Sequence, residues 1–147
     1  MRRNEDTAAR SRSRSVKTPS STVARGHTAE SLAALYLQLI GFELLERNVR
    51  DGPREMDLVV QNDRWLVVVE VRAKGSSIWG APEESVRREK RRQLLRAGRD
   101  FWWRRTDHRR ALRYDLVAIS IERDGLILRH RPHFLDPQSA SEPPSFR

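Results

Sequence analysis

The sequence has no cysteine, only four histidines and no long hydrophobic run. Without cysteine, the chain can form neither a disulfide framework nor a metal site built on thiolates. The only close pair of histidines has Pro132 between its members, which argues against a helical metal pair, so we expect imidazoles at the solvent or at strand edges. No apolar run approaches the length of a membrane span, and we expect a cytoplasmic protein with no membrane partner. The histidines are His27, His108, His130 and His133.

The length and composition of the chain indicate one small domain with polar ends. A chain of 147 residues with 37% apolar content and a mean hydropathy of −0.73 supports a single compact core. Residues 1–25 have little aliphatic content and contain a Ser-Arg repeat, so we expect a disordered basic arm. Residues 136–147 are rich in proline and serine, and we expect a disordered tail there. The folded domain should therefore span residues 26–135.

The net charge of +9 is unevenly distributed along the chain. Residues 1–25 hold seven basic and two acidic residues, a net charge of +5, and residues 87–105 hold nine basic and two acidic residues, a net charge of +7. The rest of the domain is acidic, with a net charge of −3. Segregation of this kind is typical of a surface that binds a polyanion. We therefore expect the arm and residues 87–105 to supply most of the affinity for nucleic acid.

Hydrophobic periodicity predicts the order of the elements. Apolar residues at helical spacing follow Thr28, a suitable N-cap, and stop at Gly41. The predicted fold class is α/β, with a mixed β-sheet flanked by helices in the order α-β-β-β-α-β-β. The predicted elements are a helix over 28–41, a strand over 42–49, a hairpin over 54–74, a helix that opens at Pro82, and strands over 112–121 and 126–130.

The hairpin over 54–74 is predicted to turn at Asn62-Asp63. This register pairs Val60 with Trp65 and makes one face wholly apolar. A slip by one residue would put charge into the core, so the hydrophobic pattern selects this register. The apolar face comprises Met56, Leu58, Val60, Trp65, Val67, Val69, Val71 and Ala73.

The other face of the hairpin gathers charge at the end away from the turn. Glu55, Asp57 and Glu70 lie there with Arg72 and Lys74, and the predicted register places Glu55 opposite Glu70. Directly opposed Cβ atoms are about 5 Å apart and diagonal ones about 7 to 8 Å, which suits carboxylates that converge on one cation. Mg²⁺, held by one or two carboxylates, waters and a substrate phosphate, would neutralise their repulsion. The alternative is that strand ends carry charge simply because they reach solvent.

The basic segment after Pro82 predicts an amphipathic helix with a narrow inner stripe. Val86, Leu94, Ala97 and Phe101 form that stripe, and arginines cover the exposed arc. The residues expected to bind nucleic acid are Arg87, Arg88, Lys90, Arg91, Arg92 and Arg96. Four aromatic residues could stack on bases or instead fill the core or its rim, namely Tyr36, Trp79, Trp102 and Trp103.

Several motifs resemble those of the YraN-type family of bacterial proteins, over about residues 26–135. They are Glu30-x-x-Ala33-x-x-Tyr36-Leu37, Gly41-Phe42…Arg47-Asn48, Glu55-x-Asp57-Leu58, Val69-Glu70-Val71, Gly80-x-Pro82-Glu83-Glu84-Ser85-Val86, Lys90-Arg91-Arg92 and Arg113-Tyr114-Asp115. The family is similar to Holliday-junction resolvases and belongs to the restriction-endonuclease-like group with the PD-(D/E)xK motif. The resemblance implies a restriction-endonuclease-like core and a divalent-metal nuclease site.

By position, the resemblance implies that Asp57, Glu70 and the carbonyl of Val71 bind Mg²⁺ or Mn²⁺. Glu55 matches the glutamate beside the metal aspartate. Glu30 would project from the first helix and orient water or a ligand. The alternative for Glu30 is an ordinary glutamate of the first helical turn, which the helix dipole favours.

The sequence departs from the motif at Arg72, which stands where the family has lysine. Arginine does not give up its proton at ordinary pH, so Arg72 cannot act as a general base, although it can bind a phosphate oxygen. Lys74 lies one pleat further, about 6 to 7 Å along the strand, and is a candidate substitute. We expect any cleavage to be slow, with Arg72 in an electrostatic role.

We expect a Mg²⁺-dependent endonuclease that hydrolyses phosphodiesters in DNA, with branched DNA as one substrate to test. One alternative is a non-catalytic DNA- or RNA-binding module that keeps the nuclease fold. Another is a basic scaffold that docks on ribosomes or other RNA. The sequence leaves open whether the chain cleaves at all and whether it forms a homodimer.

Overall fold

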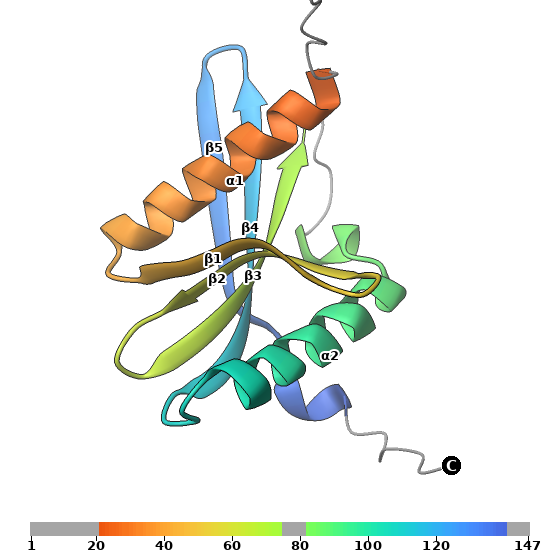
Figure 1. Ribbon diagram of the computed structural model, residues 1–147. Coiled ribbons are helices and arrows are strands. Elements are labelled where there is room, and N and C mark those ends of the chain that lie inside the picture. Colours follow the sequence, from red (N-terminus) through yellow and green to blue (C-terminus); the bar gives the residue numbers. More distant parts are fainter. Residues whose placement is uncertain (1–20, 75–81, 141–147) are drawn as a thin grey trace, which may run out of the picture.

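The computed structural model describes residues 21–74 and 82–140, which form a five-stranded sheet with two long helices (Figure 1). This confirms the predicted α/β class and the order α-β-β-β-α-β-β. No helix in these two ranges is long and apolar enough to cross a membrane. Residues 1–20 of the predicted arm and 141–147 of the predicted tail lie outside the described residues. The elements are α1 (Ser21–Leu39), β1 (Glu43–Asp51), β2 (Arg54–Gln61), β3 (Trp65–Lys74), the 3-10 helix η1 (Pro82–Ser85), α2 (Arg88–Arg105), β4 (Ala111–Glu122), β5 (Gly125–Leu135) and the 3-10 helix η2 (Pro137–Ala140).

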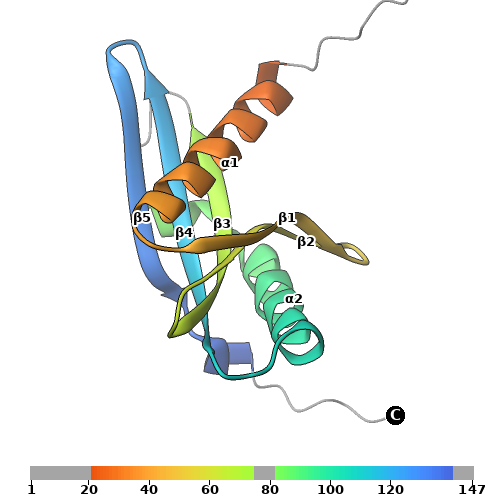
Figure 2. The ribbon, with the colours of Figure 1, turned by 60° about the vertical axis from the view of Figure 1, so that its left-hand side comes forward.

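The strands lie in the sheet in the order in which they occur in the chain. Neighbouring strands are antiparallel except for β3 and β4, which run parallel. A parallel pair needs a long crossover connection, and α2 lies in that connection. The turned view shows that the β1–β2 hairpin extends away from β4 and β5 and ends above α2 (Figure 2).

Alternation along β3 divides the core into two apolar clusters. Val67 and Val69 pack with α1 in the first, which we call the α1-side cluster. Leu66 and Val68 point to the opposite face and pack with α2 in the second, the α2-side cluster. The predicted inner stripe of the basic segment is confirmed, because Val86, Leu94, Ala97 and Phe101 are all buried in the α2-side cluster.

The helix α2 approaches β4 closely at Gly98. A Cβ atom added at Gly98 would lie 2.6 Å from the ring and hydroxyl of Tyr114. The Tyr114 hydroxyl donates a hydrogen bond to the Leu95 carbonyl at 2.8 Å, so this ring is fixed against the helix. The absence of a side chain at Gly98 therefore sets the distance between α2 and the sheet.

The helix α1 starts earlier than the sequence predicts. It begins at Ser21, and Thr28 is not its N-cap but an interior residue. The Thr28 hydroxyl donates to the Ala24 carbonyl at 2.9 Å, so its polar group is satisfied within the helix. The end of α1 is as predicted, because Gly41 adopts a φ of +101°, which favours glycine.

The helix α2 starts later than the sequence predicts. Pro82 opens the short 3-10 helix η1, and α2 begins only at Arg88. Between them Arg87 is extended, with φ −62° and ψ 153°. This interruption separates the acidic residues after Pro82 from the basic helix.

The strands β2 and β3 pair two residues out of the predicted register. Leu58 lies opposite Val69, and the turn is longer than predicted because Asn62 Oδ1 accepts a hydrogen bond from the Trp65 amide at 2.8 Å. A shift by two residues preserves the two faces of a strand, so the apolar face is largely as predicted. Met56 is the exception, because it packs in the α2-side cluster where the β1–β2 hairpin lies over α2.

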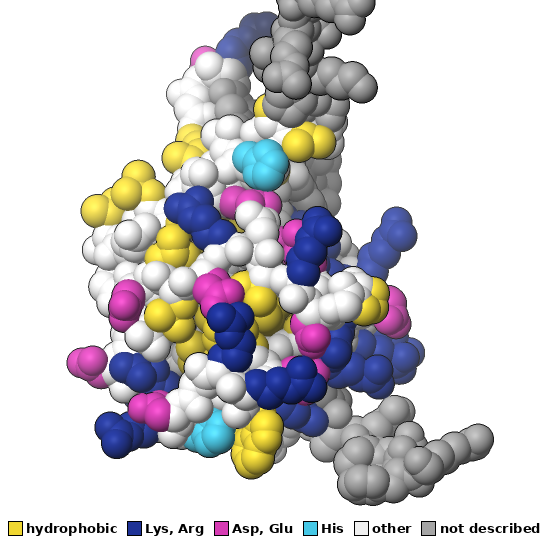
Figure 3. All heavy atoms as spheres, viewed as in Figure 1, with side chains coloured by type: hydrophobic (Ala, Val, Ile, Leu, Met, Phe, Trp, Pro, Cys, Tyr) yellow, Lys and Arg dark blue, Asp and Glu magenta, His cyan; other side chains and the backbone are white. Residues whose placement is uncertain are grey.

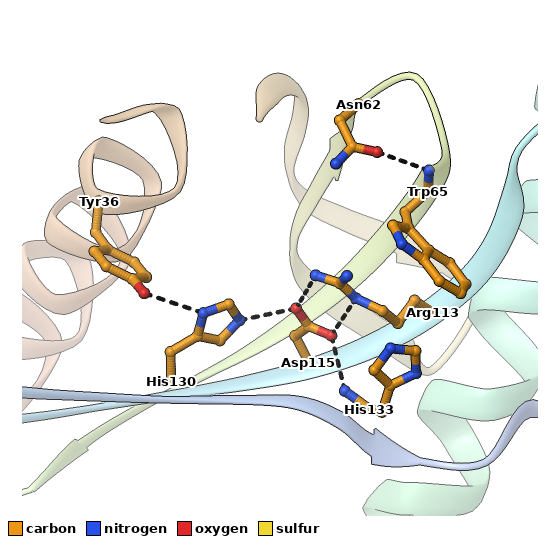
Figure 4. A network of polar contacts seen from close by, with 7 residues as sticks. All are labelled: Tyr36, Asn62, Trp65, Arg113, Asp115, His130 and His133. Carbon is orange, nitrogen blue, oxygen red and sulfur yellow. Dashed lines mark hydrogen bonds and ion pairs between the residues drawn. The ribbon is translucent and has the colours of Figure 1, made fainter. Parts of the chain in front are cut away.

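A buried polar network joins β4, β5 and α1 (Figure 4). Asp115 accepts two hydrogen bonds from the Arg113 guanidinium, at 2.8 and 2.6 Å, and one from the His133 amide at 3.1 Å. Asp115 Oδ2 also lies 2.8 Å from His130 Nε2, and His130 Nδ1 lies 3.2 Å from the Tyr36 hydroxyl. Burial acts to raise the pKa of Asp115, but the hydrogen bonds from His130 and Arg113 outweigh it and hold that pKa below its ordinary value. His130 lies on the edge strand β5, one of the two kinds of position that we predicted for the histidines, and its ring is part of an internal network.

Candidate active site

The candidate site lies where β2 and β3 part. The last backbone pair before this point is Leu58 with Val69. Beyond it, Asp57 Oδ2 accepts a hydrogen bond from the Val71 amide at 2.7 Å. A carboxylate thus takes the place of a strand partner for that amide, and it lies next to Glu70.

These residues line a cleft of about 590 Å³. The helix α1, the ends of β2 and β3, η1, Arg87 and the start of α2 all contribute to it. The structure therefore brings together residues that are far apart in the sequence. The lining residues are Gly26, Ala29, Glu30, Asp57, Glu70, Val71, Arg72, Ala73, Ser85, Arg87 and Lys90.

Asp57 and Glu70 both have pKa values above the ordinary range of a carboxyl group. Burial is the largest cause for each. The charge of Asp57 adds to the effect at Glu70, where only 3% of the residue is exposed, and raises the pKa of Glu70 to about 7. The charge of Lys90 acts in the opposite direction on both groups. The two carboxyl groups, Asp57 half-buried and Glu70 buried, repel each other and form a pair that a cation would stabilise.

Two basic side chains contact Glu70. Arg72 Nη2 lies 3.3 Å from Glu70 Oε1, and Lys90 Nζ lies 3.3 Å from Glu70 Oε2. Lys90 Nζ also donates a hydrogen bond to the Glu55 carbonyl at 3.1 Å. The cleft therefore contains a lysine amine, supplied by α2 and not by β3.

The structure places Lys90, one of the residues predicted to bind nucleic acid, in the cleft. Its side chain is 25% exposed and lines the cleft. The sequence contained a signal for this, because Lys90 falls midway between Val86 and Leu94 on the apolar stripe. A charged residue within an apolar stripe points toward the interior and needs a partner there, which is Glu70.

The two other predicted acids differ in their positions. Glu30 lines the cleft, where burial and the charge of Asp57 raise its pKa. Glu55 does not line the cleft, and its carboxylate lies 3.9 Å from Arg50 Nε. The prediction that Glu55 opposes Glu70 is wrong, because the register shift leaves Glu55 beyond the paired part of β2 and β3.

The predicted arginines lie at the rim of the cleft and along α2. Arg87 lines the cleft, whereas Arg88, Arg92 and Arg96 are exposed on α2. Arg91 is half-buried, and its Nε donates to a backbone carbonyl at 2.8 Å. Lysine and arginine side chains gather over α2 in the space-filling view (Figure 3).

The remaining predicted residues divide in a similar way. Lys74 ends β3, but its side chain, like the whole of Trp79, lies outside what the structure describes. The Tyr36 hydroxyl belongs to the buried polar network, and the Trp102 indole donates to a backbone carbonyl at 2.8 Å. Trp103 is exposed, so its ring is more open to a ligand than those of Tyr36 and Trp102.

The donors in the cleft fit a hard divalent ion that is held partly by its substrate. Asp57 and Glu70 offer carboxylate oxygens, and Val71 lines the same cleft. Across residues 21–74 and 82–140, no group of three His, Cys, Asp or Glu side chains could hold a metal ion. Mg²⁺ suits such a site, because it commonly keeps several waters and uses one or two carboxylates together with substrate phosphates.

Comparison with known proteins gives a consistent set of relatives. The family model described as "Uncharacterised protein family UPF0102" matches residues 29–119. A UPF0102 protein from Anaeromyxobacter sp. (strain Fw109-5) is 38% identical over 102 residues, which cover 69% of this chain and 77% of the relative. Another from Syntrophotalea carbinolica is 34% identical over 111 residues, which cover 76% of this chain and 90% of the relative. The solved structure titled "Crystal structure of SSO0001" has a TM-score of 0.37 and 16% identity, covers 83% of this chain and 56% of that chain, and is too distant to support a function.

Proposed function

The chain belongs to the uncharacterised protein family UPF0102, and we propose that it is a divalent-metal-dependent endonuclease that hydrolyses phosphodiesters in DNA, in the cytoplasm. The observation that carries the proposal is the pair formed by the half-buried Asp57 and the buried Glu70, in one cleft with Arg72 and Lys90. Carboxylates that could hold a cation and basic groups that could hold a phosphate are the two requirements of metal-assisted phosphodiester hydrolysis.

Asp57, Glu70 and the Val71 carbonyl would hold the metal ion. When bound, the ion supplies an activated water molecule and offsets charge that develops on the phosphate oxygens. Arg72 remains protonated and can bind a phosphate oxygen through its guanidinium. It can reach such an oxygen from its present position, because it already lines the cleft.

Lys90 takes the part of the motif lysine in this proposal. Its Nζ is 3.3 Å from Glu70 Oε2, and the side chain is partly exposed to the cleft. An ammonium group there stabilises the ionised carboxylates and can donate a hydrogen bond to a phosphate oxygen.

A second candidate function is a DNA- or RNA-binding module that does not cleave. Arg72 stands in the place of the motif lysine, and both Arg72 and Lys90 pair with Glu70, so the carboxylate is neutralised without a metal. A site in this state could bind a phosphate through its basic groups alone. Metal-dependent cleavage separates this function from the first.

The direct test is an assay of the purified full chain on single-stranded, duplex, flapped and four-way-junction DNA with Mg²⁺ or Mn²⁺. We expect new strand ends that disappear with EDTA and in the Asp57→Asn and Glu70→Gln variants. Binding to the same DNA without cleavage would refute the nuclease and favour the binding module. Activity that survives both substitutions would place the site elsewhere.

A further inference from the structure

Trp103 is the most exposed of the described tryptophan, tyrosine and phenylalanine residues, with 67% of its surface accessible. Its ring stacks on that of His108, with ring centroids 4.9 Å apart and planes 14° apart. His108 is held in this position by a left-handed φ of 59° and by the approach of its Nε2 to the Trp103 carbonyl at 2.8 Å. The result is a rigid aromatic shelf, formed by Trp103 and backed by His108, at the C-terminal end of α2.

A row of arginines leads to this shelf along the outer face of α2. Helical spacing places Arg88, Arg92, Arg96 and Arg99 on the same stripe as Trp103, and all are exposed. Arg99 Nη2 donates to a backbone carbonyl at 3.3 Å, and among the described residues no hydrogen bond or ion pair is seen for Arg88, Arg92 or Arg96. The row runs for about 22 Å at the rise of an α-helix.

The surroundings of the shelf are also positive. Residues 99–110 contain five arginines and two aspartates, a net charge of +3. One of the acids, Asp100, pairs with Arg54 at 3.1 Å, and the other, Asp107, lies 3.5 Å from Arg109. A partner that covers Trp103 must therefore be an anion with a flat apolar face.

We propose that the outer stripe of α2 binds single-stranded DNA, with phosphates on Arg88, Arg92, Arg96 and Arg99 and an unpaired base stacked on Trp103. Aromatic rings on a basic surface are the recognised means of binding single strands, because every base offers a flat face and the backbone follows the positive charge. A paired duplex keeps its base faces inside the stack, so it cannot use Trp103 in this way.

The stripe adjoins the candidate active site. Arg87 and Lys90, at the start of α2, line the cleft, whereas Trp103 lies near the other end of the same helix. A strand bound along the stripe would therefore lead from the cleft to the shelf. This inference rests on the proposed nuclease function and narrows its substrate to DNA that carries an unpaired strand, such as a flap or an open branch.

Fluorescence anisotropy of the full chain in EDTA tests the stripe without cleavage. The probes are a labelled oligothymidylate of about 20 nucleotides and a duplex of equal length. We expect Trp103→Ala to weaken oligothymidylate binding by about 5- to 150-fold, which is the range for the loss of one stacked base. Trp103→Phe should retain part of the affinity, and the duplex should be nearly unaffected. Leu126→Ala, at another exposed apolar residue, is the matched control.

The outcomes separate this inference from the proposed function. Equal oligothymidylate affinity for wild type, Trp103→Ala and Leu126→Ala would overturn the shelf even if duplex DNA is cleaved. A wild type that is dimeric, with a monomeric Trp103→Ala, would assign the shelf to contact between two copies and would also overturn it. If binding depends on Trp103 but the protein cleaves no DNA with Mn²⁺, base stacking on the shelf would be supported and the proposed nuclease activity would be refuted.

Discussion

Lys90 Nζ lies 3.3 Å from Glu70 Oε2, so the crossover helix supplies an amine to a carboxylate of the sheet. This contact predicts which basic side chain contributes more to the rate of cleavage. In single-turnover cleavage with Mn²⁺, Lys90→Ala should lower the rate by about 100-fold or more, and Arg72→Ala by about ten- to a hundredfold, which is ~1.4 to 2.7 kcal/mol of barrier. Arg72→Lys should keep or raise the rate. Arg123→Ala, an exposed residue in the turn between β4 and β5, is the control.

Two results would contradict this assignment. An unchanged rate in Lys90→Ala would limit Lys90 to a structural role. Cleavage by Arg72→Lys from an inactive wild type would show that the natural chain is a binding module.

Asp57 and Glu70 are predicted to be the protein's metal ligands. Titration calorimetry with Mn²⁺ should give a binding isotherm for the wild type and none for Asp57→Ala or Glu70→Ala, because each variant removes one of the two carboxylates proposed as metal ligands. Glu43→Ala removes a carboxylate that is exposed and hydrogen-bonded to Gln61, and it should bind as the wild type does. Identical isotherms in all four proteins would refute the assignment of Asp57 and Glu70 as metal ligands.

Glu70 should also make stability depend on pH. Burial and the charge of Asp57 raise the pKa of Glu70 from 4.5 to about 7, so its protonated form is favoured in the folded chain. That contribution to stability is complete below pH 4.5 and is lost as the pH rises through about 7. Glu70→Gln cannot ionise, so its free energy of unfolding relative to the wild type should increase by ~2 to 3 kcal/mol between pH 5 and pH 8. Urea denaturation in EDTA measures this, and a difference that does not change with pH would refute it.

The network around Asp115 should contribute to stability and not to the cleft. Asp115→Ala leaves the buried Arg113 without its partner, and loss of one member of a buried ion pair costs about 3 to 5 kcal/mol. Because the pKa of Asp115 is lowered, the wild-type contribution is present above the ordinary pKa of aspartate and is lost only as the pH falls through the lowered value. Urea unfolding at pH 7 is the measurement, with the exposed Asp63→Ala as control. A loss below about 1 kcal/mol would show that the network is dispensable.

The arginines of the outer stripe should make binding depend on salt. Replacement of Arg88, Arg92 and Arg96 by alanine should flatten the slope of log affinity for oligothymidylate against log salt by about 2, at roughly 0.7 per phosphate contact. The half-buried Arg91 already donates to a backbone carbonyl, and its replacement should change the slope less. An unchanged slope in the triple variant would move the binding surface elsewhere, to the N-terminal arm for example.

The sequence predicts the element order and much of the site, because hydrophobic alternation and helical periodicity are local properties. It cannot distinguish hairpin registers that differ by two residues, since both keep the same faces. The choice here depends on the hydrogen bond between the Asn62 side chain and the Trp65 amide, which is a detail of the turn. The sequence placed Asp57 and Glu70 near each other, as they are in the cleft, but the contact between Lys90 and Glu70 was not predicted.

Long-range polar contacts could not be predicted from the sequence either. His130 and Tyr36 are far apart in the chain and meet only because β5 and α1 pack against the same part of β4. Nothing in the spacing of His130 indicated a buried aspartate as its neighbour. The position of Lys90, by contrast, could have been inferred, because it interrupts an otherwise apolar stripe.

The close packing of Gly98 against Tyr114 affects the candidate active site, because an α-helix is stiff. A methyl group at Gly98 would meet the Tyr114 ring, so either the ring or α2 must move. Since a helix moves largely as a rigid rod, outward displacement at Gly98 would also displace Lys90, about 12 Å along the same axis. Its separation from Glu70, which belongs to the sheet, would then increase. By setting the distance between α2 and the sheet, Gly98 thereby sets the separation of Lys90 and Glu70, although Lys90 lies two to three turns away along the helix.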